Sequence, residues 1–196
     1  MRLIGLTGRS GSGKSTAAEA ARSLGFLVLD CDRIYAELTS RMTPCLKAIM
    51  ETFGTDTVRD DQLYRPALRE KVFNDPEAME KLNAITARYV GEEIQKRISQ
   101  SSADFVLLDA PTLFQSGLHA ACDLLICVVA PEEECVRRIL LRDTITEEQA
   151  RRRLAAQPSH AFFKTHCDLC IENNTSREAL FQKSIEAFES IQKGEL

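Results

Sequence analysis

The fold of this 196-residue chain is decided by one stretch, Gly8-Arg9-Ser10-Gly11-Ser12-Gly13-Lys14-Ser15. An apolar segment, residues 2–7, comes directly before it and predicts a short buried strand. An alanine-rich segment, residues 15–24, follows and predicts a helix that ends at Gly25. Residues 26–29 then predict a second strand. A strand, loop, helix and strand at this spacing form a βαβ unit, which requires a parallel sheet and a right-handed crossover.

The loop matches the phosphate-binding pattern G-x-x-x-x-G-K-[ST] through Gly8, Gly13, Lys14 and Ser15. Its glycines allow the backbone to fold closely around phosphate oxygens, and its N–H groups form an anion nest at the positive end of the next helix. In such a P-loop, Lys14 contacts the β- and γ-phosphates and the Ser15 hydroxyl ligates Mg²⁺. A glycine-rich turn without chemistry is the alternative, but the position between a strand and a helix favours triphosphate binding. The pattern leaves Arg9 open between a phosphate contact and a solvated position.

Further apolar segments predict the rest of the sheet. Residues 105–109 and 123–129 are nearly continuous apolar runs, as expected of strands covered on both faces, and residues 169–171 resemble a short fifth strand. Residues 176–192 predict an amphipathic closing helix. The segment 33–101 is instead helical in pattern and too long for a simple crossover, so we expect a helical insertion.

These elements predict an α/β fold of three layers, in which a central parallel sheet of about five strands lies between helices. We expect a single domain, residues 1–196, with three parts. The core spans about 1–33, 103–131 and 168–196, the helical insertion spans about 34–102, and a lid spans about 132–160.

Composition excludes several other classes of protein. The net charge is −4 with both signs mixed, which lacks the basic footprint of a nucleic-acid binder. No apolar run approaches the roughly 18 residues of a membrane helix, and the N-terminus shows no export signal. The seven cysteines are irregularly spaced, and the single C-x-x-C pair lacks a second zinc-ligand pair. Reduced thiols and a cytoplasmic location are therefore expected.

Three aspartates fall at the expected strand ends, where parallel sheets bind ligands. Asp109 follows four apolar residues, the arrangement in which an aspartate holds Mg²⁺ directly or through water. Asp32 follows the second strand, where a carboxylate can orient an acceptor hydroxyl and take its proton. Helix capping is the alternative for each, and we favour it for Asp30 only.

These residues resemble the dephospho-coenzyme A kinase family over nearly the whole chain. The most specific segment is Asp109-x-Pro111-x-Leu113-Phe114-x-Ser116-Gly117-Leu118. The other matching segments are Ile4 to Gly8, Asp30-x-Asp32-x-Ile34, Leu68-Arg69, Val72-Phe73-x-Asp75-Pro76, Leu82 to Ile85, Arg142-Asp143, Ala150-Arg151-x-Arg153, Ala155-Ala156-Gln157 and Ile171-x-Asn173-Asn174. The P-loop alone does not separate this family from other small kinases, whereas the specific segment together with Asp32 does.

The resemblance implies a P-loop kinase fold whose insertion forms most of the acceptor pocket. It implies transfer of the ATP γ-phosphoryl group to the ribose 3′-hydroxyl of dephospho-coenzyme A, the last step of coenzyme A synthesis. It further implies catalysis by Asp32, Lys14, Arg138 and Arg142; ATP contacts from Gly8, Ser10, Gly11, Ser12, Gly13, Lys14, Ser15, Thr16, Asn173 and Asn174; acceptor contacts from Asp32, Asp109, Leu113 and Phe114; and magnesium at Ser15 and Asp109. Dephospho-coenzyme A is the expected partner, with no nucleic acid or membrane, and a monomer is expected.

The chain departs from the family pattern on the acceptor side only. Cys31 replaces the middle residue of Asp-Ala-Asp, and Tyr35-Ala36 stand where an arginine is common. Ala87-Arg88 replace a His-Pro pair, and Gln115 replaces a glutamate. The alternative is therefore another small-molecule, nucleoside or nucleotide kinase on the same scaffold. A nucleotide-binding regulator without transfer activity is the third reading.

The predicted lid holds six arginines: Arg137, Arg138, Arg142, Arg151, Arg152 and Arg153. A solvated helix face with interspersed glutamates is one interpretation. The other is a closing lid whose arginines neutralise the transferred phosphoryl group. We expect one to three of the six to contact phosphate. His119 is similarly open between the acceptor and a surface position.

Overall fold

The computed structural model describes the whole chain, residues 1–196, as two compact units. The first unit comprises Met1–Leu29, Ala103–Gln115 and His119–Leu196, and the second comprises Asp30–Ser102 and Ser116–Leu118. No helix in either unit has the length and apolar character needed to cross a membrane.

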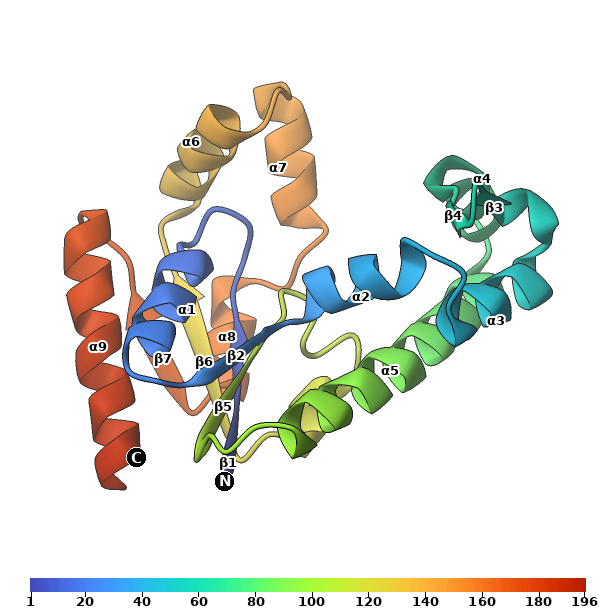
Figure 1. Cartoon of the computed structure of the whole chain (residues 1–196). Coiled ribbons are helices and arrows are strands. Elements are labelled where there is room, and N and C mark those ends of the chain that lie inside the picture. The colour runs from blue at the N-terminus through green and yellow to red at the C-terminus, as the bar shows by residue number, and fades with distance from the viewer. The chain divides into compact units, whose positions relative to one another are not determined.

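A five-stranded parallel sheet organises the first unit (Figure 1). Its strand order is β2 (Leu27–Asp30), β5 (Phe105–Asp109), β1 (Arg2–Thr7), β6 (Leu124–Val129) and β7 (Leu169–Glu172). Leu6 of β1 pairs with Asp109 of β5 and Ile126 of β6, so these strands end at the same edge. The predicted strands and the predicted α/β class are thereby confirmed, with ends shifted by one residue at most in β1, β5, β6 and β7.

Helices cover both faces of this sheet. Alternate residues of a strand face opposite sides, and β6 shows this directly. Ile126 and Val128 belong to the core beneath α1 (Lys14–Ser23) and α9 (Arg177–Lys193), whereas Cys127 and Val129 pack with α8 (His160–His166). Two further helices, α6 (Glu132–Arg142) and α7 (Glu147–Ala155), pack on each other, and a 3₁₀ turn, η2, spans Leu118–Ala121. All seven cysteines are free.

The second unit is mainly helical. Its elements are α2 (Cys31–Thr39), α3 (Pro44–Phe53), the 3₁₀ turn η1 (Thr55–Thr57), β3 (Val58–Arg59), β4 (Gln62–Leu63), α4 (Arg65–Val72) and α5 (Pro76–Ser99). Apolar residues of α3 and α4, including Ile49, Phe53 and Leu68, form its core. The predicted helical pattern is confirmed here, but the β3–β4 hairpin was missed. Its strands have two residues each, too few to show an alternating pattern, and its turn uses Asp60 and Asp61 at positive φ.

Candidate active site

The P-loop connects β1 to α1, and two of its glycines are required by their surroundings. Gly11 has φ of 77°, and a Cβ atom there would lie 2.5 Å from the Cys135 carbonyl oxygen. Gly13 has φ of 105°, and a Cβ atom there would lie 2.5 Å from the Asn173 side-chain nitrogen. Both the backbone conformation and the close neighbours therefore exclude larger residues. The loop is packed against α6 on one side and against the residues after β7 on the other.

Arg9 ties the P-loop to both ends of the α6–α7 pair. Its guanidinium donates to the Glu132 carboxylate over 2.9 Å and to the Leu154 carbonyl over 2.8 Å, and the residue is only 8% exposed. Glu132 begins α6, and Leu154 lies in the last turn of α7. The solvated position considered for Arg9 is wrong, because the side chain is buried and engaged by Glu132 and Leu154. A contact of Arg9 with phosphate stays a prediction.

Gln157 makes a second tie to the same loop. The Ser10 backbone N–H donates to Gln157 Oε1 over 2.9 Å, and Gln157 Nε2 donates to Ser10 Oγ over 3.1 Å. The sequence contained Gln157 only as part of the motif Ala155-Ala156-Gln157, and no local pattern assigned it to the P-loop. Its two contacts cross 147 positions of sequence, which no periodicity can reveal.

Arg138 and Asn173 hold the carbonyl groups in the middle of the loop. Arg138 donates to the Gly11 carbonyl over 3.2 Å, and Asn173 Nδ2 donates to the Ser12 carbonyl over 2.7 Å. The amide oxygen of Asn173 in turn accepts from Arg138 over 3.4 Å. Because a trans peptide unit is planar, fixing the Ser12 carbonyl also fixes the direction of the Gly13 N–H. Asn173 therefore sets the direction of the Gly13 N–H, one of the amides expected to contact phosphate, and Arg138 holds the Gly11 carbonyl beside it.

Lys14 and Asp109 meet at the carboxyl edge of the sheet. The Lys14 ammonium forms an ion pair with the Asp109 carboxylate, and both side chains are largely buried. Ser15 and Thr16 follow in the first turn of α1, with Ser15 exposed. The structure thus brings together the lysine, the hydroxyl-bearing turn and the strand-end aspartate that the sequence assigned to phosphate and magnesium.

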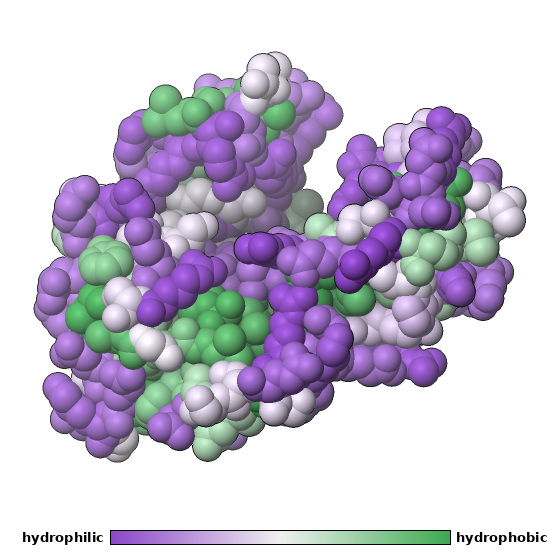
Figure 2. All heavy atoms as spheres, in the orientation of Figure 1, coloured by the Kyte–Doolittle hydropathy of each residue, from purple (hydrophilic) through white to green (hydrophobic).

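Most of the remaining arginines of α6 and α7 lie on the surface. Figure 2 shows mainly hydrophilic side chains over these two helices. Exposed ion pairs join Arg137 to Glu134 and Arg152 to Glu148. Arg151 pairs with Glu133 and Glu147. The solvated-face interpretation therefore describes these arginines, in contrast to Arg138.

Arg142, predicted to be catalytic, has a different environment from Arg138. It is exposed and makes two hydrogen bonds to the adjacent Asp143, which also pairs with Arg153. These hydrogen bonds, first from Arg142 and then from Arg153, hold the pKa of the Asp143 carboxyl well below its usual range. A contact of Arg142 with phosphate stays a prediction.

Asp32 lies in the first turn of α2, in the second unit, where it is exposed. The neighbouring Asp30 is the N-cap residue of this helix, and its side chain accepts from the Arg33 backbone N–H over 2.9 Å. The structure gives Asp30 the capping role expected for it, which leaves Asp32 outside that role. Asp30 thus caps α2, and the acceptor role of Asp32 stays a prediction.

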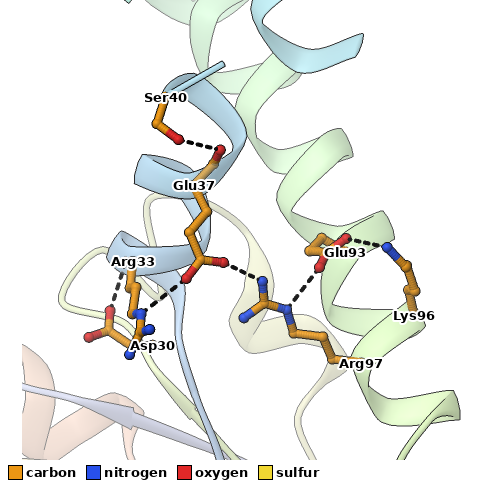
Figure 3. Close-up of polar contacts among 7 residues, drawn as sticks. All are labelled: Asp30, Arg33, Glu37, Ser40, Glu93, Lys96 and Arg97. Carbon is orange, nitrogen blue, oxygen red and sulfur yellow. Dashed lines mark hydrogen bonds and ion pairs between the residues drawn. The ribbon is translucent and has the colours of Figure 1, made fainter. Parts of the chain in front are cut away.

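A chain of polar contacts fixes α2 to α5 within the second unit (Figure 3). Arg97 of α5 donates to Glu37 over 2.5 Å and to Glu93 over 2.9 Å, and Arg33 donates to Glu37 over 3.0 Å. The hydrogen bond from Arg97 is the main cause that lowers the pKa of Glu37. The helix that carries Asp32 thus has a fixed position on the long helix of its own unit.

Of the other residues predicted to contact ligands, Leu113 and Phe114 pack against neighbouring side chains, whereas Asn174 lies on the surface. Leu113 is fully buried. The centroid of the Phe114 ring lies 4.9 Å from that of His119 and 5.1 Å from that of Phe162. Asn174 is exposed and lines a cavity of about 380 Å³ at the ends of β6 and β7. Acceptor contacts from Leu113 and Phe114, and a nucleotide contact from Asn174, stay predictions.

The family profile described as dephospho-CoA kinase matches residues 2–179. This chain belongs to the dephospho-CoA kinase family. A dephospho-CoA kinase of Idiomarina loihiensis is 36% identical to it, with 91% of this chain and 89% of the relative covered. The Escherichia coli dephospho-CoA kinase is 34% identical, with 91% and 87% covered. The resemblance inferred from the sequence motifs is thereby confirmed.

Solved structures agree with this family assignment. The dephospho-CoA kinase of Campylobacter jejuni superposes with a TM-score of 0.72 at 27% identity, and the match covers 100% of both chains. A Thermus thermophilus protein superposes with a TM-score of 0.84 at 32% identity, and the match covers 96% of both chains. A shikimate kinase of Acinetobacter baumannii, at 18% identity and a TM-score of 0.55, shares the fold alone.

Proposed function

We propose that this member of the dephospho-CoA kinase family transfers the γ-phosphoryl group of ATP to the ribose 3′-hydroxyl of dephospho-CoA, which gives CoA and ADP. The observation that carries this proposal is the P-loop, whose carbonyl groups are held by Arg138 and Asn173 while Lys14 and Asp109 meet at its end. This arrangement suits a polyphosphate chain, and family membership supports dephospho-CoA as the acceptor.

In this proposal the P-loop amides and Lys14 bind the β- and γ-phosphates. Phosphoryl transfer depends mostly on positioning and on neutralising charge, so pre-oriented amides contribute directly to the rate. Arg138 already lies against the loop through Gly11 and Ser12, where its charge adds to the positive potential at the start of α1. Arg142, at the end of α6, approaches the transferred group when α6 and α7 act as a lid.

Magnesium fits the donor set at the same place. The exposed Ser15 hydroxyl and the Asp109 carboxylate are hard oxygen donors, the kind that Mg²⁺ prefers in phosphate sites. When bound there, the ion neutralises charge on the β- and γ-phosphates. Asp109 is also the acceptor of the Lys14 ion pair, so the same carboxylate orients the ammonium group.

Asp32 is the proposed base for the acceptor hydroxyl. It follows β2 by two residues and is exposed at the start of α2, while Asp30 takes the capping role. A positioned carboxylate that accepts this proton typically contributes about 10²- to 10⁴-fold. The polar contacts that hold α2 on α5 keep this residue on a rigid support.

We also propose that the protein acts in the cytoplasm as a monomer. Its seven free thiols support a reducing compartment. Its exposed large hydrophobic residues, such as Met1, Phe73, Leu141 and Leu196, belong to separate segments of the chain. Size-exclusion chromatography with light scattering would test the monomer directly.

An ADP-release assay tests the activity. ADP release should require both dephospho-CoA and Mg²⁺, and the product should carry a 3′-phosphate by NMR. Turnover with nucleoside monophosphates but none with dephospho-CoA would contradict the proposal and favour another nucleotide kinase. ATP binding without transfer to any acceptor would favour a regulator.

A further inference from the structure

Two arginines of α4, Arg65 and Arg69, belong to the basic residues of the second unit that form no ion pair; Arg41, Lys47 and Arg59 are the others. Many of the unit's basic residues form ion pairs within it: Arg33, Lys71, Lys81, Arg88, Lys96 and Arg97. Arg65 and Arg69 form none, although this unit is rich in carboxylates. Both are exposed. Two positive charges on one short helix thus form no ion pair within the protein.

These arginines line an open cavity of about 550 Å³ together with an exposed aromatic ring. The lining comprises Arg65, Pro66, Arg69, Glu70, Phe73 and Asn74. Positions 65, 69 and 73 follow a spacing of four, which places them along one face of the helix and its end. Phe73 is 73% exposed, which is unusual for so large an apolar side chain. The cavity therefore combines two cations with an apolar surface.

A contact within the unit relates this cavity to the helix that bears Asp32. The Arg65 guanidinium carbon lies 5.8 Å from the centroid of the Tyr35 ring. Tyr35 belongs to α2 and follows Asp32 by three residues, which is almost one helical turn. The cationic end of the cavity thus lies beside Tyr35 in the middle of α2, and Phe73 lies about two helical turns after Arg65 along α4.

The groups of the acceptor in the proposed reaction follow one another in the same order as Asp32, the two arginines and Phe73. In dephospho-CoA the ribose 3′-hydroxyl is followed by a doubly charged diphosphate bridge, and then by an arm that begins with a dimethyl-substituted carbon. We propose that Arg65 and Arg69 bind the diphosphate bridge and that Phe73 contacts the apolar part of the arm. This inference rests on the proposed function, because it uses a hydroxyl positioned at Asp32. Glu70 opposes the anion, so the lining carries two positive groups and one negative group.

Steady-state kinetics of Arg65→Ala and Arg69→Ala test the assignment. The KM for dephospho-CoA should rise about tenfold in each, since a hydrogen bond to a charged group contributes about 1.5–3 kcal/mol and each 1.4 kcal/mol is tenfold. The KM for ATP and the kcat should stay within about twofold, because these side chains do not act on the phosphoryl group. Lys81→Ala, which removes an exposed charge from the same unit, should leave all three constants unchanged.

Product inhibition identifies which part of the acceptor is bound. CoA contains the diphosphate bridge, whereas adenosine 3′-phosphate lacks it. The two variants should weaken inhibition by CoA and leave inhibition by adenosine 3′-phosphate unchanged. A loss of folding would weaken both, and circular dichroism melting would detect it. Glu70→Gln should have the opposite effect and lower the KM for dephospho-CoA.

The outcomes separate this inference from the proposed function. If the wild-type protein phosphorylates dephospho-CoA and neither arginine variant changes the KM for dephospho-CoA, the assignment is wrong and the proposed function stands. Equal weakening of the two inhibitors would also overturn it, because the effect would not depend on the diphosphate. Absence of wild-type turnover with dephospho-CoA would overturn both.

Discussion

The polar side chains around the P-loop and the arginines of helix α4 differ in whether they have partners within the protein. Around the P-loop, Arg9, Gln157, Arg138 and Asn173 all bind other groups of the protein, and even Lys14 is paired with Asp109. On α4, Arg65 and Arg69 form no ion pair and line an open cavity. The side chains around the P-loop are thus held by intramolecular contacts, whereas the two arginines of α4 can bind an anion from solution.

This difference reflects the chemistry that each region must perform. Backbone amides can bind phosphate only if the loop conformation is held in advance, and a displacement of about 1 Å costs roughly 10²-fold in rate. Long cationic side chains reach an anion by rotation and need less prior order. We therefore expect changes around the P-loop to affect catalysis through geometry, and changes on α4 to affect binding of one substrate.

The largest effect is expected for Lys14→Ala. It removes the charge that contacts the transferred phosphates and leaves the largely buried Asp109 carboxylate without its ammonium partner. We expect kcat/KM to fall by about 10³-fold, the upper range for loss of one transition-state donor. Lys193→Ala on the surface of α9 is the matched control. An ADP-release assay measures both, and activity near wild type in Lys14→Ala would contradict the proposed role of the loop.

Asp32→Asn separates acceptor chemistry from nucleotide binding. We expect kcat to fall by about 10²-fold or more because the amide cannot accept the hydroxyl proton. ATP affinity, measured by calorimetry, should not change. Asp30→Asn is a close control, since asparagine is as good an N-cap as aspartate and should preserve α2. Equal losses in the two variants would point to a structural role for Asp32 instead.

Gln157→Ala tests whether the ties to the P-loop matter for ATP. Loss of its two partly buried hydrogen bonds with Ser10 should raise the KM for ATP by up to about tenfold, since an unsatisfied polar group costs about 1–3 kcal/mol when buried. The KM for dephospho-CoA should stay constant, which is the reverse of the pattern expected for α4. Gln182→Ala, an exposed change on α9, is the control. A raised KM for both substrates would remove the distinction between the two regions.

The smallest effect is expected for Arg152→Ala. Its ion pair with Glu148 is exposed on both sides, and such pairs contribute about 0–1 kcal/mol. Activity should be unchanged, and the melting temperature should move by no more than a few degrees. Arg138→Ala on the same pair of helices should weaken ATP binding clearly more. Similar kinetics for the two variants would show that contact with the P-loop carbonyls is unimportant.

The sequence predicted those features that depend on neighbouring residues. The apolar runs indicated all five strands of the main sheet, and the glycine pattern between a strand and a helix indicated the P-loop. The motif from Asp109 to Leu118, with Asp32, indicated the family. Such features are readable because strand periodicity, helix caps and tight turns are set by residues a few positions apart.

Only the tertiary structure decided how the P-loop is held and which arginines are engaged. Arg9 reaches α7 across 145 positions, and Asn173 reaches Ser12 across 161. Among the six arginines of α6 and α7, identical in charge, Arg138 alone faces the loop carbonyls. Contacts between distant segments depend on how the whole sheet brings its edges together, so no local pattern distinguishes an arginine that binds a carbonyl group from one that faces water.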